Sequence, residues 1–461
     1  GELPREMILR RERQTMRGSR FVGCGLVLLL GGAITLPVWA DEPRNSSGAG
    51  SLSDNWPQWR GARLDSHSSE TGLPVNFGKE QNLVWRVELP GPAGSSPVVW
   101  NDRVFVTTAA GDKLELLAFD LAGKQLWSAA LDGENRKLRM DSANYAAPSP
   151  LTDGEHVWAT SSAGVLHCFT LAGEQVWKVD LQEKYGAFDI QFGMASTPVL
   201  DNGRLYHQLL HGNMQDDSPG VGIVLCLDAK SGQQIWRHDR ASAATFENKH
   251  SYSSPIIYRD SQREYLVIHG GDVATAHSLV DGAEIWRVGG LNPAASYNNY
   301  LRFVSSPGCA EGMIVVPSAK GGPVLCLRPD LQGELTDRAE AYLWKMDRGT
   351  PDVASPVIHE GLVYLCIENG LVTCVDAKTG KEYYKERLLS DQHRSTPVVA
   401  DGKLYITGRK GKVLVLATGT EPKVLAENDL DEVTTASPAI SNGRVYIRTF
   451  EALYCFGEGG K

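Results

Sequence analysis

The sequence lacks the short motifs that mark several kinds of enzyme. It has no Cys-x-x-Cys-His run, so a covalently attached haem is not expected, and no Gly-x-Ser-x-Gly elbow of the hydrolase type. The run Gly-Arg-Lys-Gly-Lys at 408–412 is too short for a phosphate loop, and Val413 follows where serine or threonine is required. We therefore predict no catalytic residue, and we interpret this run as a basic β-turn.

The chain also lacks an excess of positive charge. It contains 46 lysines and arginines against 55 aspartates and glutamates, a net charge of −9. Residues 1–40 hold six arginines and three glutamates, so removing their net +3 takes the remainder to −12. An acidic protein is a poor partner for nucleic acid, and we expect no nucleic-acid binding.

What the chain does contain is an eightfold repeat. A serine or threonine is followed by proline, a short apolar run, a turn and a second short strand, and the prolines are 41 to 57 residues apart. A repeat of this length is typical of propellers and solenoids. The eight pairs are Ser96-Pro97, Ser149-Pro150, Thr197-Pro198, Ser254-Pro255, Ser306-Pro307, Ser355-Pro356, Thr396-Pro397 and Ser437-Pro438.

Turn signals divide each unit into antiparallel strands. Asn202-Gly203 and Asp401-Gly402 are hairpin turns after the first strand, and proline, which has no N–H, suits the first residue of a strand. Most units close with a tryptophan, a natural wedge between neighbouring sheets. The fold class predicted is all-β, an eight-bladed β-propeller of four-stranded antiparallel blades.

The last unit ends without a fourth strand, whereas residues 82–89 resemble a closing strand with nothing before it. We predict that residues 82–89 complete the last blade and so close the ring, which removes exposed sheet edges. The propeller is expected to occupy residues 82–461.

Residues 1–40 are predicted to be a secretory signal peptide. Two arginines at 17 and 20 precede an apolar run over 21–36, and the expected cleavage site follows Ala40. The alternative is a permanent membrane anchor, although about 20 apolar residues are needed to span a bilayer. The expected location is therefore the periplasm or the exterior, with peripheral association with the cell envelope possible.

Residues 41–81 are predicted to form a flexible tether followed by an arm. The stretch 41–54 is polar and rich in glycine and serine, which favours a tether. The run Trp-Pro-Gln-Trp-Arg-Gly at 56–61 is too aromatic for a linker, and we expect it to lie against the propeller. The alternative is that this arm covers a ligand site.

The cysteines follow the repeat instead of a disulfide pattern. Five of the eight occupy one position in the third strand, where other units have alanine or valine, which indicates a small buried apolar side chain. Cys366 and Cys374 flank the Asn369-Gly370 hairpin, where a two-residue turn would place Cys366 opposite Thr373 and the two thiols on opposite faces. We predict buried free thiols.

A candidate binding site follows from the fold. In a propeller, the segments just before the innermost strands gather around the axis at one face, and this funnel is the default ligand site. The alternative is that these loops are polar only because they are exposed. The candidate ligand-binding residues are Tyr145, Phe192, His250, Tyr252, Asn299, Tyr300, Arg302, Asp352, His393 and Arg394.

No metal site is predicted. His207 and His211 lie in a strand, where four residues span about 13 Å, too far for one ion. Asp216 and Asp217 in the insertion of the third unit could meet a calcium ion, but a solvated loop is the favoured interpretation.

The repeat resembles that of the pyrroloquinoline-quinone (PQQ) type of propeller. The segments that carry this resemblance are 118–127, 226–236 and 374–384, of the form Cys-Leu-Asp-Ala-Lys-Ser-Gly-Gln-Gln-Ile-Trp. One branch of this family comprises quinoprotein alcohol and sugar dehydrogenases, which hold PQQ and calcium in the funnel, many with a disulfide between adjacent cysteines. The other comprises BamB-like propellers, non-enzymatic proteins of outer-membrane assembly.

The chain resembles the second branch more closely. No two cysteines are adjacent, and the chain is short for a dehydrogenase. The resemblance implies an exported, non-catalytic binding or scaffold propeller, expected to be monomeric, with protein partners or a small ligand at the funnel and no cofactor. The alternatives are a PQQ-dependent dehydrogenase and a carbohydrate- or peptide-binding module.

Overall fold

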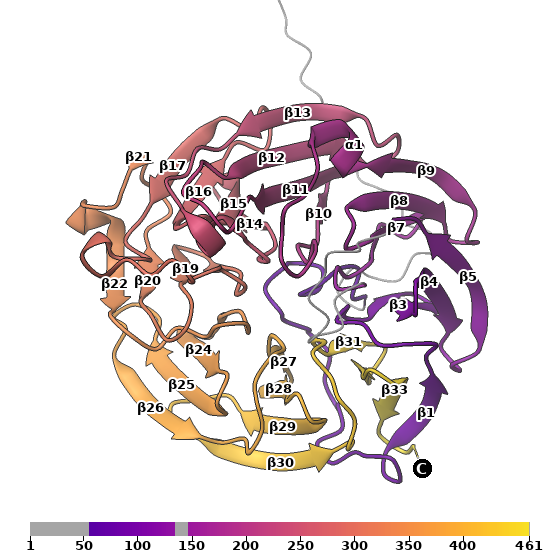
Figure 1. Ribbon diagram of the computed structural model, residues 1–461. Coiled ribbons are helices and arrows are strands. Elements are labelled where there is room, and N and C mark those ends of the chain that lie inside the picture. The colour runs from indigo at the N-terminus through magenta and orange to yellow at the C-terminus, as the bar shows by residue number, and fades with distance from the viewer. Residues whose placement is uncertain (1–54, 134–145, 461) are drawn as a thin grey trace, which may run out of the picture. The chain divides into compact units, whose positions relative to one another are not determined.

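Eight β-sheets follow one another around a central axis in the computed structural model (Figure 1). The structure describes residues 55–133 and 146–460, which belong to one compact unit. Each sheet is built from four antiparallel strands, and the fourth sheet carries one extra strand. The predicted all-β, eight-bladed propeller is confirmed. The predicted signal peptide and tether lie outside the described residues.

The first four blades are formed by consecutive strands, numbered from the axis outward. They are β2 (Val98–Trp100), β3 (Arg103–Ala110), β4 (Lys113–Asp120) and β5 (Gln125–Leu131); β6 (Leu151–Thr152), β7 (His156–Thr160), β8 (Val165–Thr170) and β9 (Gln175–Asp180); β10 (Val199–Asp201), β11 (Arg204–His211), β12 (Val221–Asp228) and β13 (Gln234–Asp239); and β14 (Ile256–Arg259), β15 (Glu264–Gly270), β16 (Val273–His277) and β17 (Glu284–Val288). Helix α1 (Leu181–Tyr185) follows β9, and β21 (Gly333–Glu334) adds to β17 in parallel.

The other four blades have the same plan. They are β18 (Gly308–Ala310), β19 (Met313–Pro317), β20 (Val324–Leu327) and β22 (Tyr342–Met346); β23 (Val357–His359), β24 (Leu362–Ile367), β25 (Leu371–Asp376) and β26 (Glu382–Arg387); β27 (Val398–Ala400), β28 (Lys403–Thr407), β29 (Lys412–Ala417) and β30 (Lys423–Asp429); and β31 (Ala439–Ser441), β32 (Arg444–Arg448) and β33 (Ala452–Gly457), completed by β1 (Leu83–Glu88). The pairing of β1 with β33 confirms the predicted closure by the N-terminal strand. No helix among the described residues is long and apolar enough to cross a membrane.

The repeated tryptophans join each blade to the next. The Trp236 indole N–H donates to the carbonyl of Leu279 at 3.2 Å, and its ring lies against Gly282 so closely that a Cβ there would come within 2.5 Å. Gly282 has φ +77°, which glycine adopts without strain. The same tryptophan–glycine contact joins Trp85 to Gly123, Trp127 to Gly173, Trp177 to Gly232 and Trp344 to Gly380. The predicted wedge between sheets is therefore confirmed, and glycine is its partner.

The small position in the third strand lies directly opposite this tryptophan. Cys226 pairs with Trp236, and the five cysteines at this position are completely buried. A larger side chain would compete with the indole for the same space between sheets, which explains the cysteine, alanine or valine found there. The seven cysteines in the described residues are free, as predicted, and Cys309 is the partly exposed one.

The predicted register around Asn369-Gly370 was wrong. Cys366 pairs with Val372, and Cys374 pairs with Tyr364. Because Val372 and Cys374 are two residues apart, both thiols lie on the same face, in one hydrophobic cluster. The physical reason is a three-residue loop, residues 368–370, in which Gly370 takes φ +86°.

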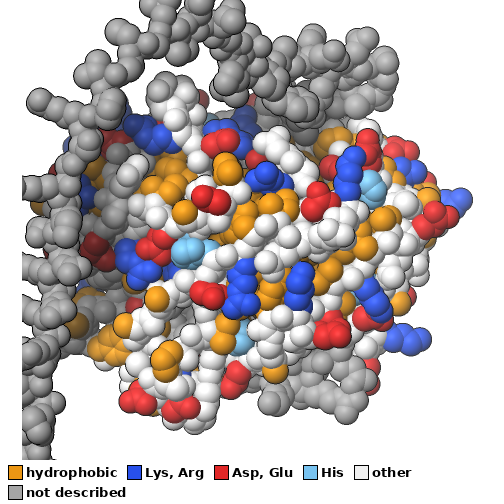
Figure 2. All heavy atoms as spheres, turned by 90° about the horizontal axis from the view of Figure 1, so that it is seen from above, with side chains coloured by type: hydrophobic (Ala, Val, Ile, Leu, Met, Phe, Trp, Pro, Cys, Tyr) orange, Lys and Arg blue, Asp and Glu red, His pale blue; other side chains and the backbone are white. Residues whose placement is uncertain are grey.

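The outermost strands expose one apolar residue per blade in most blades. The residue before each tryptophan is exposed, for example Ile235 at 43% and Leu126 at 43%, because neighbouring residues on a strand face opposite sides. Figure 2 shows hydrophobic side chains among lysines, arginines and acidic residues on the edge of the ring. Charged side chains of this kind discourage the exposed edge strands from pairing with strands of other molecules.

Candidate functional site

The N-terminal arm winds around the axis and contacts the innermost strands in blade order. Trp56 exchanges two backbone hydrogen bonds of 2.9 Å with Val99, and the carbonyl of Pro57 accepts from the N–H of Thr152. Further along, Ser66 and Ser68 bond to Val399, and the Glu70 carboxylate accepts from the turn after β31. The innermost strands would otherwise leave these backbone groups unpaired, so the arm satisfies them. The interpretation of residues 55–81 as an arm lying on the propeller agrees with this path.

Each residue of the Trp-Pro-Gln-Trp-Arg-Gly run has its own contact. The side-chain amide of Gln58 bonds to both the N–H and the carbonyl of Leu200. The Arg60 guanidinium donates to the carbonyls of Pro307 at 2.7 Å and Pro356 at 3.0 Å, so it joins two blades. Burial lowers the pKa of Arg60 to about 10, which leaves it charged at neutral pH. Gly61, at φ +79°, lies against the Trp56 ring.

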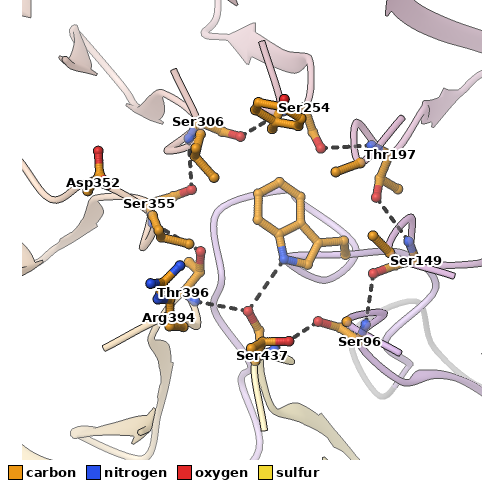
Figure 3. Close-up of a pocket in the computed structure, with 18 of the residues that line it drawn as sticks. Ser96, Ser149, Thr197, Ser254, Ser306, Asp352, Ser355, Arg394, Thr396 and Ser437 are labelled. Carbon is orange, nitrogen blue, oxygen red and sulfur yellow. Dashed lines mark hydrogen bonds between the residues drawn. The ribbon is translucent and has the colours of Figure 1, made fainter. Parts of the chain in front are cut away.

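The serines and threonines before the prolines form a closed ring of hydrogen bonds (Figure 3). In every blade the backbone N–H of this residue donates to the hydroxyl of its counterpart in the next blade, over 2.8 to 3.1 Å, and Ser437 donates to Ser96 to complete the circle. The members are Ser96, Ser149, Thr197, Ser254, Ser306, Ser355, Thr396 and Ser437. A hydroxyl can accept this bond and still donate its own hydrogen, which explains why the position is serine or threonine.

The ring surrounds the floor of a pocket that we call the axial cup. The cup has a volume of about 270 Å³, and the eight hydroxyl residues and Trp59 all line it. The Trp59 indole N–H makes a long hydrogen bond of 3.5 Å to the Ser437 hydroxyl. Trp56 and Arg60 are buried, but Trp59 is only half-buried, so part of its ring faces the cup. The arm therefore forms the floor of the cup from the opposite face of the ring.

Charged and aromatic side chains line one side of the cup. They come from the lead-in segments of blades 3 to 7 and from two hairpin loops: Phe192, Tyr252, Arg302, Asp352, Glu368, Arg394 and Arg409. The described residues opposite them are small, namely Gly94, Ala147 and Thr435. Among the described residues, the charged side chains of the cup therefore lie on one side, whereas the ring hydroxyls surround it.

The charges on this side are mostly paired. The Arg394 Nε lies 3.2 Å from a Glu368 carboxylate oxygen, and Arg302 pairs with Glu247 at 3.1 Å. Arg302 also lies over the Phe192 ring at 5.2 Å, a cation–π contact. Burial, and next the nearby Asp352 carboxylate, raise the pKa of Glu368, and the surrounding arginines only partly offset them.

Five of the ten predicted binding residues line the cup: Phe192, Tyr252, Arg302, Asp352 and Arg394. His250 and His393 do not line it, because both are fully buried beneath the loops that were expected to present them. Asn299 and Tyr300 belong to the loop between blades 4 and 5, outside the cup lining, and Tyr300 is 58% exposed. Tyr145 lies outside the described residues.

Sequence reasoning included Trp59 only in the alternative that the arm covers a ligand site, and among the charged residues of the cup it missed Glu368 and Arg409. The last two lie in hairpins between the second and third strands. In an antiparallel blade these hairpins end at the same face as the segments leading into the first strand, which is a signal the sequence contains. Trp59 could not be assigned to the cup from the sequence, because the path of the arm across the axis is a tertiary property.

The insertion of the third blade, for which the sequence left a calcium ion as an alternative, surrounds the side chain of Lys249. The Lys249 ammonium, completely buried, lies 2.9 Å from an Asp216 carboxylate oxygen and bonds to the carbonyls of Asn213 and Asp216. These oxygen atoms supply the hydrogen-bond acceptors that the buried ammonium group requires. Within the described chain, the one group of three side chains close enough to share an ion is Asp153, Glu155 and His156 in the β6–β7 turn, away from the cup.

The repeats and the ring define the class: an eight-bladed propeller of the PQQ type. The sequence model of the family described as outer membrane protein assembly factor BamB matches residues 76–215, 139–322 and 332–449. These ranges cover most of the chain, which therefore belongs to this family of BamB-like propellers.

Individual relatives are distant. The outer membrane protein assembly factor BamB of Yersinia pestis is 24% identical over 247 residues, 53% of this chain and 57% of that protein. The chain thus spans only about half the length of the curated relatives it matches.

Two solved structures share the fold. BamB from Moraxella catarrhalis matches 82% of this chain and 98% of its own, with a TM-score of 0.56 and 13% identity. Quinohemoprotein alcohol dehydrogenase from Comamonas testosteroni matches 89% of this chain and 81% of its own, with a TM-score of 0.64 and 12% identity. At such identities the likeness concerns the fold alone.

Proposed function

We propose that this protein is a non-catalytic binding propeller of the bacterial envelope that supports the assembly of outer-membrane proteins. The observation that carries this proposal is the match of the BamB family over most of the chain. The plain blades agree with a scaffold, because their loops add no second domain within the described residues. Under this proposal residues 1–40 direct export, and the protein partners bind in the periplasm.

The second candidate is a dehydrogenase that uses PQQ and calcium, since a quinohemoprotein dehydrogenase shares the fold. The arginines of the cup suit the carboxylates of such a quinone. The calcium half of the site does not fit: calcium needs six to eight oxygen ligands. Among the described residues, the cup offers two carboxylates, Asp352 and Glu368, and Glu368 is held by Arg394. We therefore derive no reaction step through this cofactor.

Deletion of the gene in its native host tests the scaffold proposal. We expect lower levels of β-barrel proteins in the outer membrane, greater sensitivity to detergents, and rescue by the full-length gene. Unchanged barrel levels and unchanged sensitivity would contradict the proposal.

Purified protein incubated with PQQ and calcium tests the second candidate separately. We expect no reduction of an electron-accepting dye with simple alcohols or sugars. Sustained dye reduction that requires both additions would replace the scaffold proposal with the dehydrogenase.

A further inference from the structure

The axial cup has the chemistry of a small-molecule site independent of any protein partner. Its volume of about 270 Å³ is just below the usual range for ligand pockets, roughly 300–1,000 Å³. A folded partner cannot enter a space of this size, whereas one ring of a small molecule can. Among the described residues, Trp59 lines the floor of this space.

The cup presents both donors and acceptors. Each hydroxyl of the ring accepts an N–H from the preceding blade and retains its own hydrogen to donate, so the floor is surrounded by O–H donors. The wall adds guanidinium donors from Arg394 and Arg302 and carboxylate acceptors from Asp352 and Glu368. A simple anion uses only donors and would face these two carboxylates. The wall therefore favours a ligand whose groups both donate and accept.

The charge balance points the same way. Glu368 neutralises Arg394, and Glu247 neutralises Arg302, so two of the three arginines that line the cup already have counter-charges. A ligand with its own strong charge would have to break one of these pairs, which costs the desolvation of the partner left behind. A neutral ligand with many hydroxyls can bond to the paired groups without separating them.

The floor supplies a flat apolar surface. The Arg60 guanidinium lies over the Trp59 ring at 5.7 Å, and the half-buried ring also faces the cup. An indole offers a broad apolar face with little conformational freedom to lose. An aromatic platform bordered by paired charged groups and hydroxyls suits a molecule with C–H groups on its face and hydroxyls on its rim.

We propose that the axial cup binds a neutral pyranose sugar, which stacks on Trp59 and exchanges hydrogen bonds with Asp352, Glu368, Arg394 and the hydroxyl ring. This function goes beyond envelope assembly and does not depend on it. Sugar binding is measured on the purified protein, so it can fail or succeed irrespective of the outer-membrane phenotype.

Saturation-transfer NMR and calorimetry with the full chain test this proposal. The probes are the methyl pyranosides of glucose, galactose, mannose and N-acetylglucosamine, with citrate as the anionic probe. We expect at least one pyranoside to bind with a Kd of about 1 mM or tighter, and citrate to bind at least tenfold more weakly.

Two variants locate the binding in the cup. Asp352→Asn and Arg394→Gln leave the arm in place and are expected to weaken sugar binding at least tenfold. The matched controls Glu427→Gln and Arg237→Gln change charged groups paired on outer strands, with Lys412 and Asp239, and should bind as the parent does. Trp59→Phe, which retains an aromatic ring, is expected to weaken binding less than Trp59→Leu.

Three results would overturn the proposal. The first is that none of the pyranosides binds saturably at concentrations up to about 10 mM, which is ten times a Kd of 1 mM. The second is tighter binding of citrate than of any sugar. The third is sugar binding that Asp352→Asn and Arg394→Gln leave unchanged while their melting temperatures match the parent, because the sugar would then bind elsewhere.

Discussion

Arg86 of the first strand and Glu432 of the last blade are 346 residues apart and form an ion pair of 3.1 Å. Glu432 is almost fully buried, and its carboxylate also accepts hydrogen bonds from Thr449 at 2.6 Å and Tyr454 at 2.5 Å. Burial by itself would raise the pKa of Glu432, but these bonds and Arg86 outweigh it and lower the pKa. This pair fixes β1 to the final blade beyond the backbone pairing of the two strands.

Replacing Glu432 by alanine should destabilise the ring by roughly 3 kcal/mol, because two buried hydroxyls and Arg86 lose their common acceptor. Urea unfolding followed by tryptophan fluorescence measures the change. Glu427→Ala, which breaks the pair with Lys412 on an outer strand, is the control and should cost less than about 1 kcal/mol. Equal effects of the two substitutions would contradict the closing role of Glu432.

Neighbouring residues on β13 offer a matched test of the wedge between blades. Trp236 is 7% exposed and fills the space against Gly282, whereas Ile235 is 43% exposed on the same strand. Trp236→Ala should cost roughly 3–5 kcal/mol, as for other large aromatic truncations in cores, and Ile235→Ala less than about 0.5 kcal/mol. Thermal unfolding monitored by circular dichroism distinguishes these values, and a small loss for Trp236→Ala would show that the wedge is dispensable.

Arg60→Ala should loosen the arm without unfolding the blades. The substitution removes the hydrogen bonds that Arg60 donates to blades 5 and 6. A second variant, Arg60→Lys, retains the positive charge but lacks the forked geometry of the guanidinium. We expect faster tryptic cleavage after Arg63, whose side chain is 64% exposed, in both variants, and more so in Arg60→Ala. Cleavage after Arg63 at the parental rate in Arg60→Ala would contradict a holding role for Arg60. Cleavage after Arg409, in a blade loop, serves as the internal reference.

The buried histidines predict a loss of stability in acid. Burial lowers the pKa of His207 to about 4 and that of His269 to about 3, from an ordinary value of 6.5. Below pH 6.5 the unfolded chain therefore binds more protons than the folded one. Stability is fully retained above this pH and declines as the pH falls toward 4, by on the order of 3 kcal/mol for His207 alone. Urea midpoints measured between pH 7.5 and 4.5 should show this decline.

His207→Leu tests the origin of the acid sensitivity. Neither ring nitrogen of His207 has a hydrogen-bond partner within the described protein, so an apolar side chain of similar size suits the site at neutral pH. The variant should be about as stable as the parent at pH 7.5 and lose less stability at pH 4.5. The same loss in both proteins would assign the acid sensitivity to other groups.

The sequence predicted the features that repeat. Eight equivalent Ser/Thr-Pro pairs, the turns and the wedge tryptophans each recur, so every unit supports the interpretation of the others. The closing strand at 82–89 was predictable for the same reason, because its tryptophan matched a strand that the last unit lacked. The structure gives β1 as Leu83–Glu88.

Features that occur once were harder to predict. His250 and His393 precede innermost strands as expected, yet both side chains are buried, and desolvation lowers their pKa. The Cys366 register depended on a loop being three residues long instead of two, a difference that the dipeptide Asn369-Gly370 does not reveal. Residues 55–61 cross the axis because they pair with backbone groups that the separate blades leave without partners. No local sequence pattern indicates this path.

The union of β1 with β33 constrains the order in which this protein can fold. Blade 8 needs residues 83–88, which are synthesised long before residues 452–457. Until residues 452–457 have been made, β1 has no partner strand in its own chain and its edge is open to other chains. Such distant pairing is slow because a very long loop must close first. We expect the ring to close in a late, rate-limiting step, during which the unfinished molecule is at its most prone to aggregation.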